Sequence, residues 1–160
     1  MKLEPGQPPQ VETTHVVLPP HTNAHGSAFG GQIMAWMDII AGICSARHCK
    51  GPAVTVSVDE LVFNKPIRLG DIVVMKANLN YVGHTSMEVG VRVESENART
   101  GQVEHCLSGY FTFVAIDAEG KPKEVPGINS LFMTPEQLNW YDQAKERVKN
   151  RLEKRKWKTT

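Results

Sequence analysis

The stretch from Asn23 to Asp38, NAHGSAFGGQIMAWMD, contains three residue types that could do chemistry together. An Asn-x-x-Gly turn begins at Asn23, a Gly-Gly pair stands at residues 30–31, and Asp38 is a lone carboxylate further along. A carboxylate can accept a proton. The N-terminus of a helix presents unpaired N–H groups and a positive dipole end, which suit a carbonyl oxygen that gains negative charge. The stretch therefore favours chemistry at a carbonyl group.

The element that must position Asp38 is a predicted helix from about Gly30 to His48. At 100° per residue its large apolar side chains share one side, and they are Ile33, Trp36, Met37, Ile40 and Cys44. Asp38 lies instead on a stripe of mostly small residues, which another backbone or a ligand can approach: Gly31, Met34, Ala35, Ala41, Gly42 and Ser45. No basic residue lies within one turn of Asp38, and a buried carboxylate without a partner is costly. The spacing alone leaves two interpretations open: a functional acid, or an acid that faces solvent or a subunit interface.

The other members of the stretch also have structural interpretations. A Gly-Gly pair by itself is more often a tight entry to a helix than an oxyanion site. An asparagine before a turn commonly bonds its own backbone. His21 and His25 are close in sequence but lack a third ligand at a convincing spacing, so no metal site is predicted.

Length and composition predict one globular domain without a global attraction to polyanions. The chain has 160 residues and a formal net charge of +1, which argues against nucleic acid as a partner. Its N-terminus lacks the apolar run of a signal peptide, and no later stretch is long enough for a membrane span, so we expect a cytoplasmic location. The cysteines, Cys44, Cys49 and Cys106, have no zinc-type spacing and are interpreted as packing residues.

The remaining elements are predicted from hydrophobic periodicity. A first strand lies within residues 12–20, and four more strand-like runs follow the helix, over residues 53–63, 71–83, 86–95 and 102–117. In the run 86–95, apolar and charged residues alternate with the period of a half-buried antiparallel strand. Because the turns between the later runs are short, parallel crossovers are excluded for most of the sheet. The fold class is therefore α+β, with one long helix followed by an antiparallel meander.

A second helix is predicted at the C-terminus. Thr134 can cap it, Pro135 suits its first turn, and Gln137 completes a capping box. Residues 134–160 carry eight basic and four acidic side chains, and a basic helix end is most often a solvated face. We therefore expect a flexible arm over residues 1–10, a domain over 11–133, and a basic helix packed on it over 134–160.

Linked motifs in this order resemble those of the hotdog-fold acyl-CoA thioesterases, specifically the cytosolic acyl-CoA hydrolase group. The resemblance covers about residues 11–151 and rests on NAHGSAFGGQIMAWMD, VTVSVDELVFNKPIRLGD, GHTSMEVGVRVE, a later TG and the closing YDQAKER. It implies a hotdog fold, in which a long central helix is wrapped by a curled antiparallel sheet. It also implies a homodimer joined sheet edge to sheet edge, or a trimer of such dimers.

The resemblance implies an enzyme that hydrolyses acyl-CoA thioesters in lipid metabolism. Asn23 and Asp38 would meet from opposite subunits, with Asp38 as general base or nucleophile, Asn23 orienting the water or the carbonyl, and Gly31 supplying an oxyanion N–H. Coenzyme A, as part of substrate and product, would contact two segments and one basic side chain: Val56, Ser57 and Val58; Thr85, Ser86 and Met87; and Arg147. No further cofactor is expected. For Val56 and Val58, core packing with backbone contact alone is the other interpretation.

Two other functions fit the same fold. A non-catalytic acyl-CoA sensor would be expected to lose the acid, and Asp38 argues against it. An enoyl thioester hydratase usually pairs an Asp with a His a few residues further along the central helix. Here no histidine follows Asp38 before His48, which makes hydration the weaker interpretation.

Overall fold

Five antiparallel strands and two long helices make up residues 2–158, the part of the chain that this computed structural model describes. The strands lie in the order β1-β3-β4-β5-β2, so β1 and β2 form the two edges of the sheet. The elements are β1 (Gln10–Val16), α1 (Gly30–Cys49), β2 (Ala53–Val58), β3 (Ile72–Val82), β4 (Ser86–Glu96), β5 (Val103–Ala115) and α2 (Pro135–Lys158), with 3-10 turns at Pro19–His21 and Ser130–Phe132.

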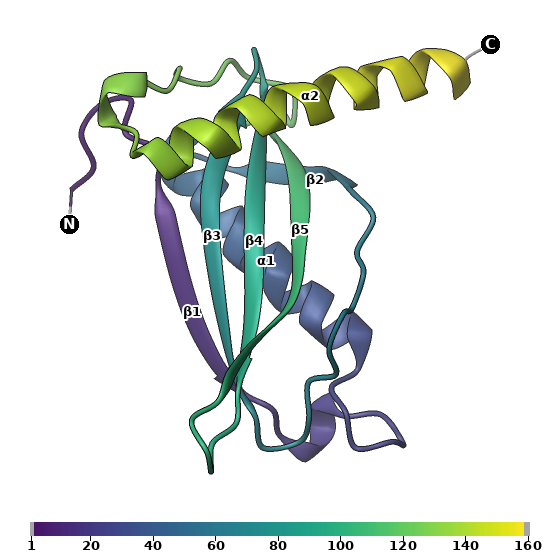
Figure 1. Cartoon of the computed structure of the whole chain (residues 1–160). Helices are drawn as coiled ribbons and strands as arrows, with labels where there is room; N and C mark the ends of the chain where they lie inside the picture. The colour runs from purple at the N-terminus through teal and green to yellow at the C-terminus, as the bar shows by residue number, and fades with distance from the viewer. Residues whose placement is uncertain (1, 159–160) are drawn as a thin grey trace.

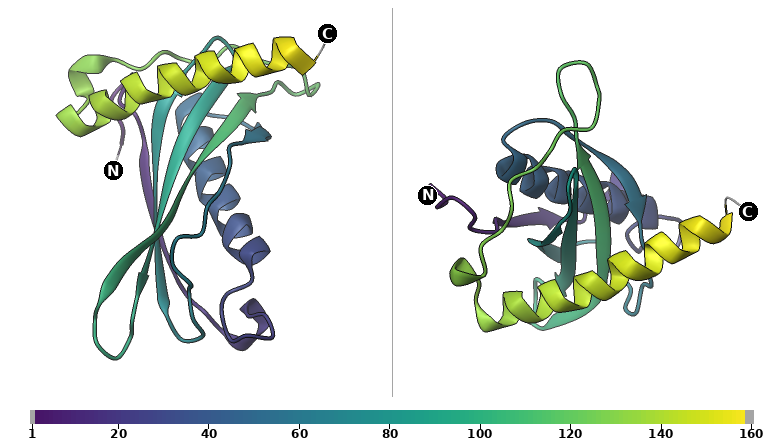
Figure 2. Two further views of the ribbon diagram at one scale, coloured as in Figure 1. Left: turned by 45° about the vertical axis from the view of Figure 1, so that its right-hand side comes forward. Right: turned by 90° about the horizontal axis from the view of Figure 1, so that it is seen from above.

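The sheet has one long helix on each face. Helix α1 lies along the face behind the sheet in Figure 1, and α2 crosses the opposite face near one end of β3, β4 and β5. The view from above in Figure 2 separates the two helices by the sheet, and its other view shows how strongly the strands twist. The predicted hotdog arrangement is confirmed, including the consecutive antiparallel pairing of β3, β4 and β5.

The apolar side of α1 forms the core with the inner face of the sheet, as the helical periodicity predicts. Ile33, Met37, Ile40 and Cys44 are buried completely or nearly so. The alternate residues of β3, β4 and β5 that face them are also buried: Val73, Met75, Ala77, Leu79, Met87, Val89, Val91, Val93, Leu107, Phe111, Phe113 and Ala115. All three cysteines are buried free thiols, which agrees with the packing role expected for them.

Strand β2 is shorter than its apolar run predicts, because the chain leaves the ladder after Val58. Pairing with β5 shifts by one residue between Thr55 and Ser57, which marks a bulge at Val56. Beyond it only separate hydrogen bonds follow β5, from Asp59 N to Tyr110 O (3.0 Å) and from Asn64 N to Cys106 O (2.9 Å). The part of the apolar run beyond Val58 therefore lies beside β5 without forming a continuous strand.

The N-terminal segment also differs from the arm expected over residues 1–10. Strand β1 begins at Gln10, and the two prolines before it, Pro8 and Pro9, are buried. The carbonyl of Pro9 accepts hydrogen bonds from Leu79 N (3.2 Å) and Cys44 Sγ (3.4 Å). Prolines lack an N–H but keep their carbonyl, so they can close this corner of the core without leaving a donor unpaired.

The start of α2 forms the capping box that the sequence predicts. Gln137 N donates to Thr134 Oγ1 at 3.2 Å, and Thr134 N donates to Gln137 Oε1 at 2.9 Å. The side chain of Gln137 also donates to Asn78 Oδ1 of β3 at 3.0 Å. One residue thus caps the helix and joins it to the sheet.

A buried histidine at the end of α1 makes the stability of the fold depend on pH. His48 Nε2 lies 2.7 Å from the carbonyl oxygen of Pro126, which can only accept, so Nε2–H donates. Burial lowers the pKa of His48 below its usual 6.5, and the bond to Pro126 offsets part of this effect. A lowered pKa means that the unfolded chain binds the proton more readily than the folded chain does. The contribution of His48 to the free energy of unfolding is therefore complete above about pH 6.5 and is lost as the pH falls through the folded-state pKa.

We expect the free energy of unfolding of the wild type to fall between pH 7 and pH 5, and that of His48→Gln to fall less. Glutamine can still donate to Pro126 but cannot take up a proton. His15, whose pKa is lowered by burial and by His21, supplies a residual slope in both proteins. Urea unfolding at a series of pH values measures this. Equal slopes would show that His48 does not contribute.

Candidate active site

Asp38 has one hydrogen-bond partner among the residues that the structure describes, and this partner comes from β2. Thr55 Oγ1 donates to Asp38 Oδ1 at 2.6 Å, which joins the middle of α1 to the edge strand of the sheet. Asp38 is half-buried, and Thr55 is exposed. A bond to one carboxylate oxygen fixes the direction in which the other oxygen points, and that oxygen remains able to accept a proton or bind water. The sequence reasoning missed Thr55, although it directly precedes the predicted segment Val56–Val58.

The small-residue stripe that carries Asp38 is divided by the fold. Gly31, Met34 and Ala35 are exposed, whereas Ala41 and Ser45 are buried. The half of the stripe on the N-terminal side of Asp38 is therefore open to a ligand or another chain, as expected, and the other half packs inside this chain.

Asn23 holds the turn that leads into α1. Its Oδ1 accepts hydrogen bonds from the backbone N–H of His25 (2.9 Å) and of Ser27 (3.3 Å). These bonds agree with the interpretation in which the asparagine bonds the backbone of its own turn. Its Nδ2 donates to Ser27 Oγ at 3.2 Å, and an amide nitrogen has a second proton to offer. The exposed side chain is thus oriented by the turn and keeps one donor.

The first N–H groups of α1 are open. Within the described residues, the N–H groups of Gly30 and Gly31 have no backbone acceptor, whereas Gln32 and Ile33 both donate to the carbonyl of Phe29. A cleft of about 370 Å³ opens beside Gly30, between the helix and residues 63–67. A Cβ atom at Gly31 would collide with the ring of Phe29. This arrangement can present N–H donors to an oxygen atom.

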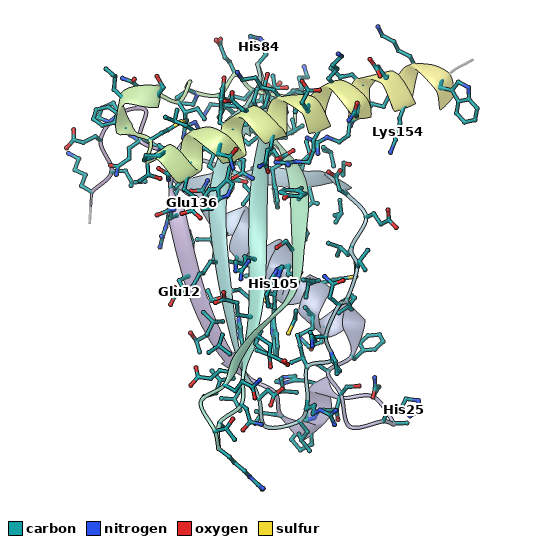
Figure 3. The ribbon with its side chains drawn as sticks, viewed as in Figure 1. Glu12, His25, His84, His105, Glu136 and Lys154 are labelled. Atoms are coloured by element: carbon teal, nitrogen blue, oxygen red, sulfur yellow. The ribbon has the colours of Figure 1, made fainter. Side chains whose placement is uncertain are left out.

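The predicted catalytic residues form two groups that lie apart in one chain. Asn23 and Gly31 belong to the start of α1, and Asp38 and Thr55 meet further along it. Eight residues separate Gly30 from Asp38, which is about 12 Å along a helix axis. Figure 3 shows His25, in the same turn as Asn23, at the end of the molecule opposite α2. Within one chain the predicted residues thus form two separate groups, which the predicted shared site would use as two half-sites.

Exposed apolar side chains occur on both sides of Asp38 and Thr55 along α1, β2 and the segments that adjoin them, and we name these side chains the α1–β2 face. Its members are 38–59% exposed: Phe29, Met34, Ile39, Ile43, Val54, Val56, Val58, Val62 and Phe63. Val56 and Val58 therefore do not pack in the core of this chain, contrary to the core-packing interpretation of these two residues. An apolar surface around a polar pair is typical of an interface or a ligand site.

The segments predicted to contact coenzyme A approach one another at one end of the sheet. Ser57 pairs with Thr112 of β5, which pairs with Glu88 of β4, so these three side chains share the face under α2. Ser57, Thr85 and Ser86 are half-buried. Met87 is completely buried in the core, so the contact predicted for this residue would have to come from its backbone.

Arg147 is neither a solvated side chain nor a free cation. Its Nε and Nη2 donate to the carboxylate of Glu88 at 3.1 and 2.6 Å, and its guanidinium carbon lies 3.6 Å from the ring centre of Tyr110. Arg151 joins the same carboxylate at 2.6 Å and also Asp59 at 2.9 Å. Strand alternation places Glu88 on the polar face of β4, but sequence alone does not reveal that α2 covers it.

Two negative findings apply to the residues that the structure describes. No three potential metal ligands gather into a metal site. No helix combines the length and apolarity that a bilayer crossing requires.

Comparisons with known proteins agree with this fold. The profile of the thioesterase superfamily matches residues 25–102. A Bacillus subtilis protein named as an uncharacterized acyl-CoA thioester hydrolase is 38% identical over 147 residues, which cover 92% of this chain and 84% of that protein. A solved acyl-CoA hydrolase from Staphylococcus aureus, in complex with butyryl coenzyme A and coenzyme A, is 37% identical with a TM-score of 0.86, over 94% of this chain and 90% of that one.

A solved apo-hexameric acyl-CoA thioesterase is 36% identical with a TM-score of 0.86, over 91% of this chain and 92% of that one. The Staphylococcus aureus enzyme has also been solved with alanine in place of an asparagine, an aspartate or a threonine. The fold and site define a hotdog thioesterase. Because the relatives match over nearly the whole chain, it belongs to the acyl-CoA thioester hydrolases of the thioesterase superfamily.

The contacts of Arg147 predict that Arg147→Ala destabilises the fold. Glu88 is 1% exposed, and removal of one partner from a buried ion pair typically costs several kcal/mol. We expect a loss of about 3 kcal/mol, the lower end of that range, because Arg151 still contacts Glu88. Urea unfolding of the variant measures it. Arg92→Ala, which removes an exposed partner of Glu94, is the matched control and should cost less than about 1 kcal/mol. Equal losses would contradict the buried role of Glu88.

Proposed function

We propose that this protein hydrolyses fatty acyl-CoA to a free fatty acid and coenzyme A at a site shared by two subunits. Asn23 and Gly31 of one subunit would meet Asp38 of the partner subunit. The observation that carries the proposal is the Asp38–Thr55 pair, which lies within the exposed α1–β2 face and away from the turn of Asn23. The cytoplasmic location remains a prediction from the sequence.

The residue types at the two half-sites suit thioester hydrolysis. Asp38 takes a proton from water, and the resulting hydroxide attacks the carbonyl carbon, while the N–H of Gly31 stabilises the negative charge on the oxygen. Asn23 Nδ2 orients the carbonyl or the water. The intermediate then expels the coenzyme A thiolate, and the proton held by Asp38 reprotonates the sulfur. The hydrogen bond from Thr55 keeps the carboxylate in place. Attack by Asp38 itself on the carbonyl is the alternative first step.

The spacing of residues altered in a relative supports the same set. The asparagine, aspartate and threonine replaced by alanine in the Staphylococcus aureus enzyme are separated by 15 and 17 residues. Asn23, Asp38 and Thr55 have the same separations in this chain. Thr55, which the geometry identifies as the partner of Asp38, thus corresponds to a position that was chosen for substitution in that enzyme.

The two edges of the sheet differ in a way that favours pairing at β2. Exposed positions of β1 include Gln10, Glu12 and Thr14, whereas the exposed positions of β2 are mainly valines. Charged residues protect an edge strand, and an apolar edge invites another strand. We infer that β2 and the α1–β2 face are covered by a second copy of the chain, and that such dimers assemble further, as in the hexameric relative.

The assembly predicts that the wild type is a dimer or hexamer at micromolar concentration. Val54→Lys should shift it toward a monomer, because a lysine on the edge strand would have to be buried at the interface. Light scattering after size-exclusion chromatography measures the mass. Leu131→Lys, at a highly exposed apolar residue outside this face, is the control and should leave the mass unchanged. A stable wild-type monomer would refute the shared site.

Single substitutions test the proposed roles. Asp38→Ala should lower kcat about a hundredfold or more, as the loss of a general base typically does. Asn23→Ala should cost less but remain severe, and Thr55→Val should lower kcat without removing the base. Thiol release from an acyl-CoA series, from acetyl to palmitoyl, measures hydrolysis. A wild type that binds coenzyme A but releases no thiol would support the sensor function instead.

Mixing two inactive variants tests whether the site is shared. After subunit exchange between Asp38→Ala and Asn23→Ala, each heterodimer has one site with both native residues and one site with neither. Activity should therefore partly return. Mass spectrometry of differently tagged chains verifies the exchange. Verified heterodimers without recovered activity would rule out the shared site, and the single variants would still test the hydrolase function.

A further inference from the structure

Glu88 is a charged side chain buried under α2 that the proposed chemistry does not use. It is 1% exposed and accepts four hydrogen bonds, three from Arg147 and one from Arg151. Asp59 accepts a further bond from Arg151 at 2.9 Å. These four residues form a closed set of two acids and two bases, which we name the α2 charge cluster.

A buried ion cluster of this kind fixes geometry more than it adds stability. Burying a carboxylate is expensive, and paired charges only roughly compensate for the cost. The hydrogen bonds of the cluster are directional. Because two arginines separated by one helical turn bond the same carboxylate, they set both the rotation and the position of α2 against β4. The alternative, apolar packing under α2, would hold the helix without fixing its arginines.

The cluster lies where the segments expected to bind coenzyme A approach one another. Glu88 directly follows the segment Thr85–Met87, and Asp59 directly follows Val58. Thr112 lies between Glu88 and Ser57 in the sheet, and its hydroxyl is buried without a hydrogen-bond partner among the described residues. In Figure 3, Lys154 projects from the part of α2 one turn beyond Arg151. The cluster thus connects β2, β4 and the basic side of α2.

We propose that Glu88 is a positioning residue for coenzyme A, which through Arg147 and Arg151 holds α2 so that its cations meet the nucleotide phosphates. This inference rests on the proposed function. Nε and Nη2 of Arg147 bond Glu88, and Nη1, which has no hydrogen-bond partner among the described residues, can bind a phosphate. Glu88 acts through these arginines and does not itself touch the substrate.

Two opposing effects of removing the charge of Glu88 must be compared. The negative charge of Glu88 also repels a phosphate, but its pairs with two arginines already neutralise this charge. Loss of the charge-assisted hydrogen bonds frees both guanidinium groups from the positions that Glu88 gives them. Release of the arginines therefore outweighs the gain in charge, and coenzyme A should bind more weakly.

The test compares Glu88→Gln with wild type on the same acyl group carried by coenzyme A or by pantetheine, which lacks the nucleotide. We expect the KM for acyl-CoA to rise about tenfold, which corresponds to about 1.4 kcal/mol, with kcat within about twofold. The KM for acyl-pantetheine should stay unchanged. A KM that is unchanged or lower for acyl-CoA would overturn the inference, and so would an equal rise for both substrates, which indicates a purely structural role.

Two further variants keep the test valid if Glu88→Gln folds poorly. Asp59→Asn releases only Arg151 and should shift the KM for acyl-CoA in the same direction by a smaller factor. Glu94→Gln removes a carboxylate that bonds Lys76 and Arg92 on the same sheet face, and it should leave both KM values unchanged. If Asp59→Asn and Glu94→Gln behave alike, the inference fails.

Calorimetric titration of wild type with coenzyme A separates this inference from the proposed function. A wild type that binds no coenzyme A would overturn both. A wild type that binds coenzyme A, with Glu88→Gln binding it equally well, would overturn the positioning role alone.

Discussion

The burial of one side of α1 against a strongly twisted sheet is the constraint on which the other features of this protein depend. The twist curls the inner face of the sheet around the helix, and this burial removes the large apolar side chains of α1 from water. The same packing determines which residues stay outside. With Ile33, Met37 and Ile40 directed inward, Gly31 and the adjacent small residues must lie at the surface, and Asp38 at its border.

The curled sheet leaves its edge strand β2 only partly covered, and the proposed half-site of Asp38 lies at this edge. Strand β2 lies beside the middle of α1, close enough for Thr55 to reach Asp38. The apolar side chains around this pair have no partner in their own chain that covers them fully. The shared site proposed at this edge would use a second subunit both for stability and for chemistry, and the proposed catalytic and interface residues therefore alternate along the same short segments.

Asp38 and Glu88 lie in opposite environments in this fold. Asp38 has a neutral hydroxyl partner and partial access to solvent, which leaves a carboxylate oxygen available for reaction. Glu88 is fully enclosed and saturated by two arginines, which makes it suitable for holding α2 and unsuitable for proton transfer. The difference comes from burial and from the type of partner, since the two side chains carry the same functional group.

The sequence by itself determined the elements and their faces. The periodicity of residues 30–48 and of 86–95, together with the Thr134–Gln137 capping box, predicted α1, β4 and the start of α2, because these signals come from contacts between residues close in the chain. The motif from Asn23 to Asp38 also indicated Asp38 as the candidate acid, since a lone carboxylate on a stripe of small residues is visible in the sequence itself.

Only the tertiary structure decided what each polar group contacts. Thr55 as the partner of Asp38, Glu88 as the partner of Arg147, the burial of Met87 and the end of β2 at Val58 all depend on residues brought together from distant parts of the chain. Local pattern cannot encode them, because hydrogen-bond partners and burial are set by which strand lies beside which helix.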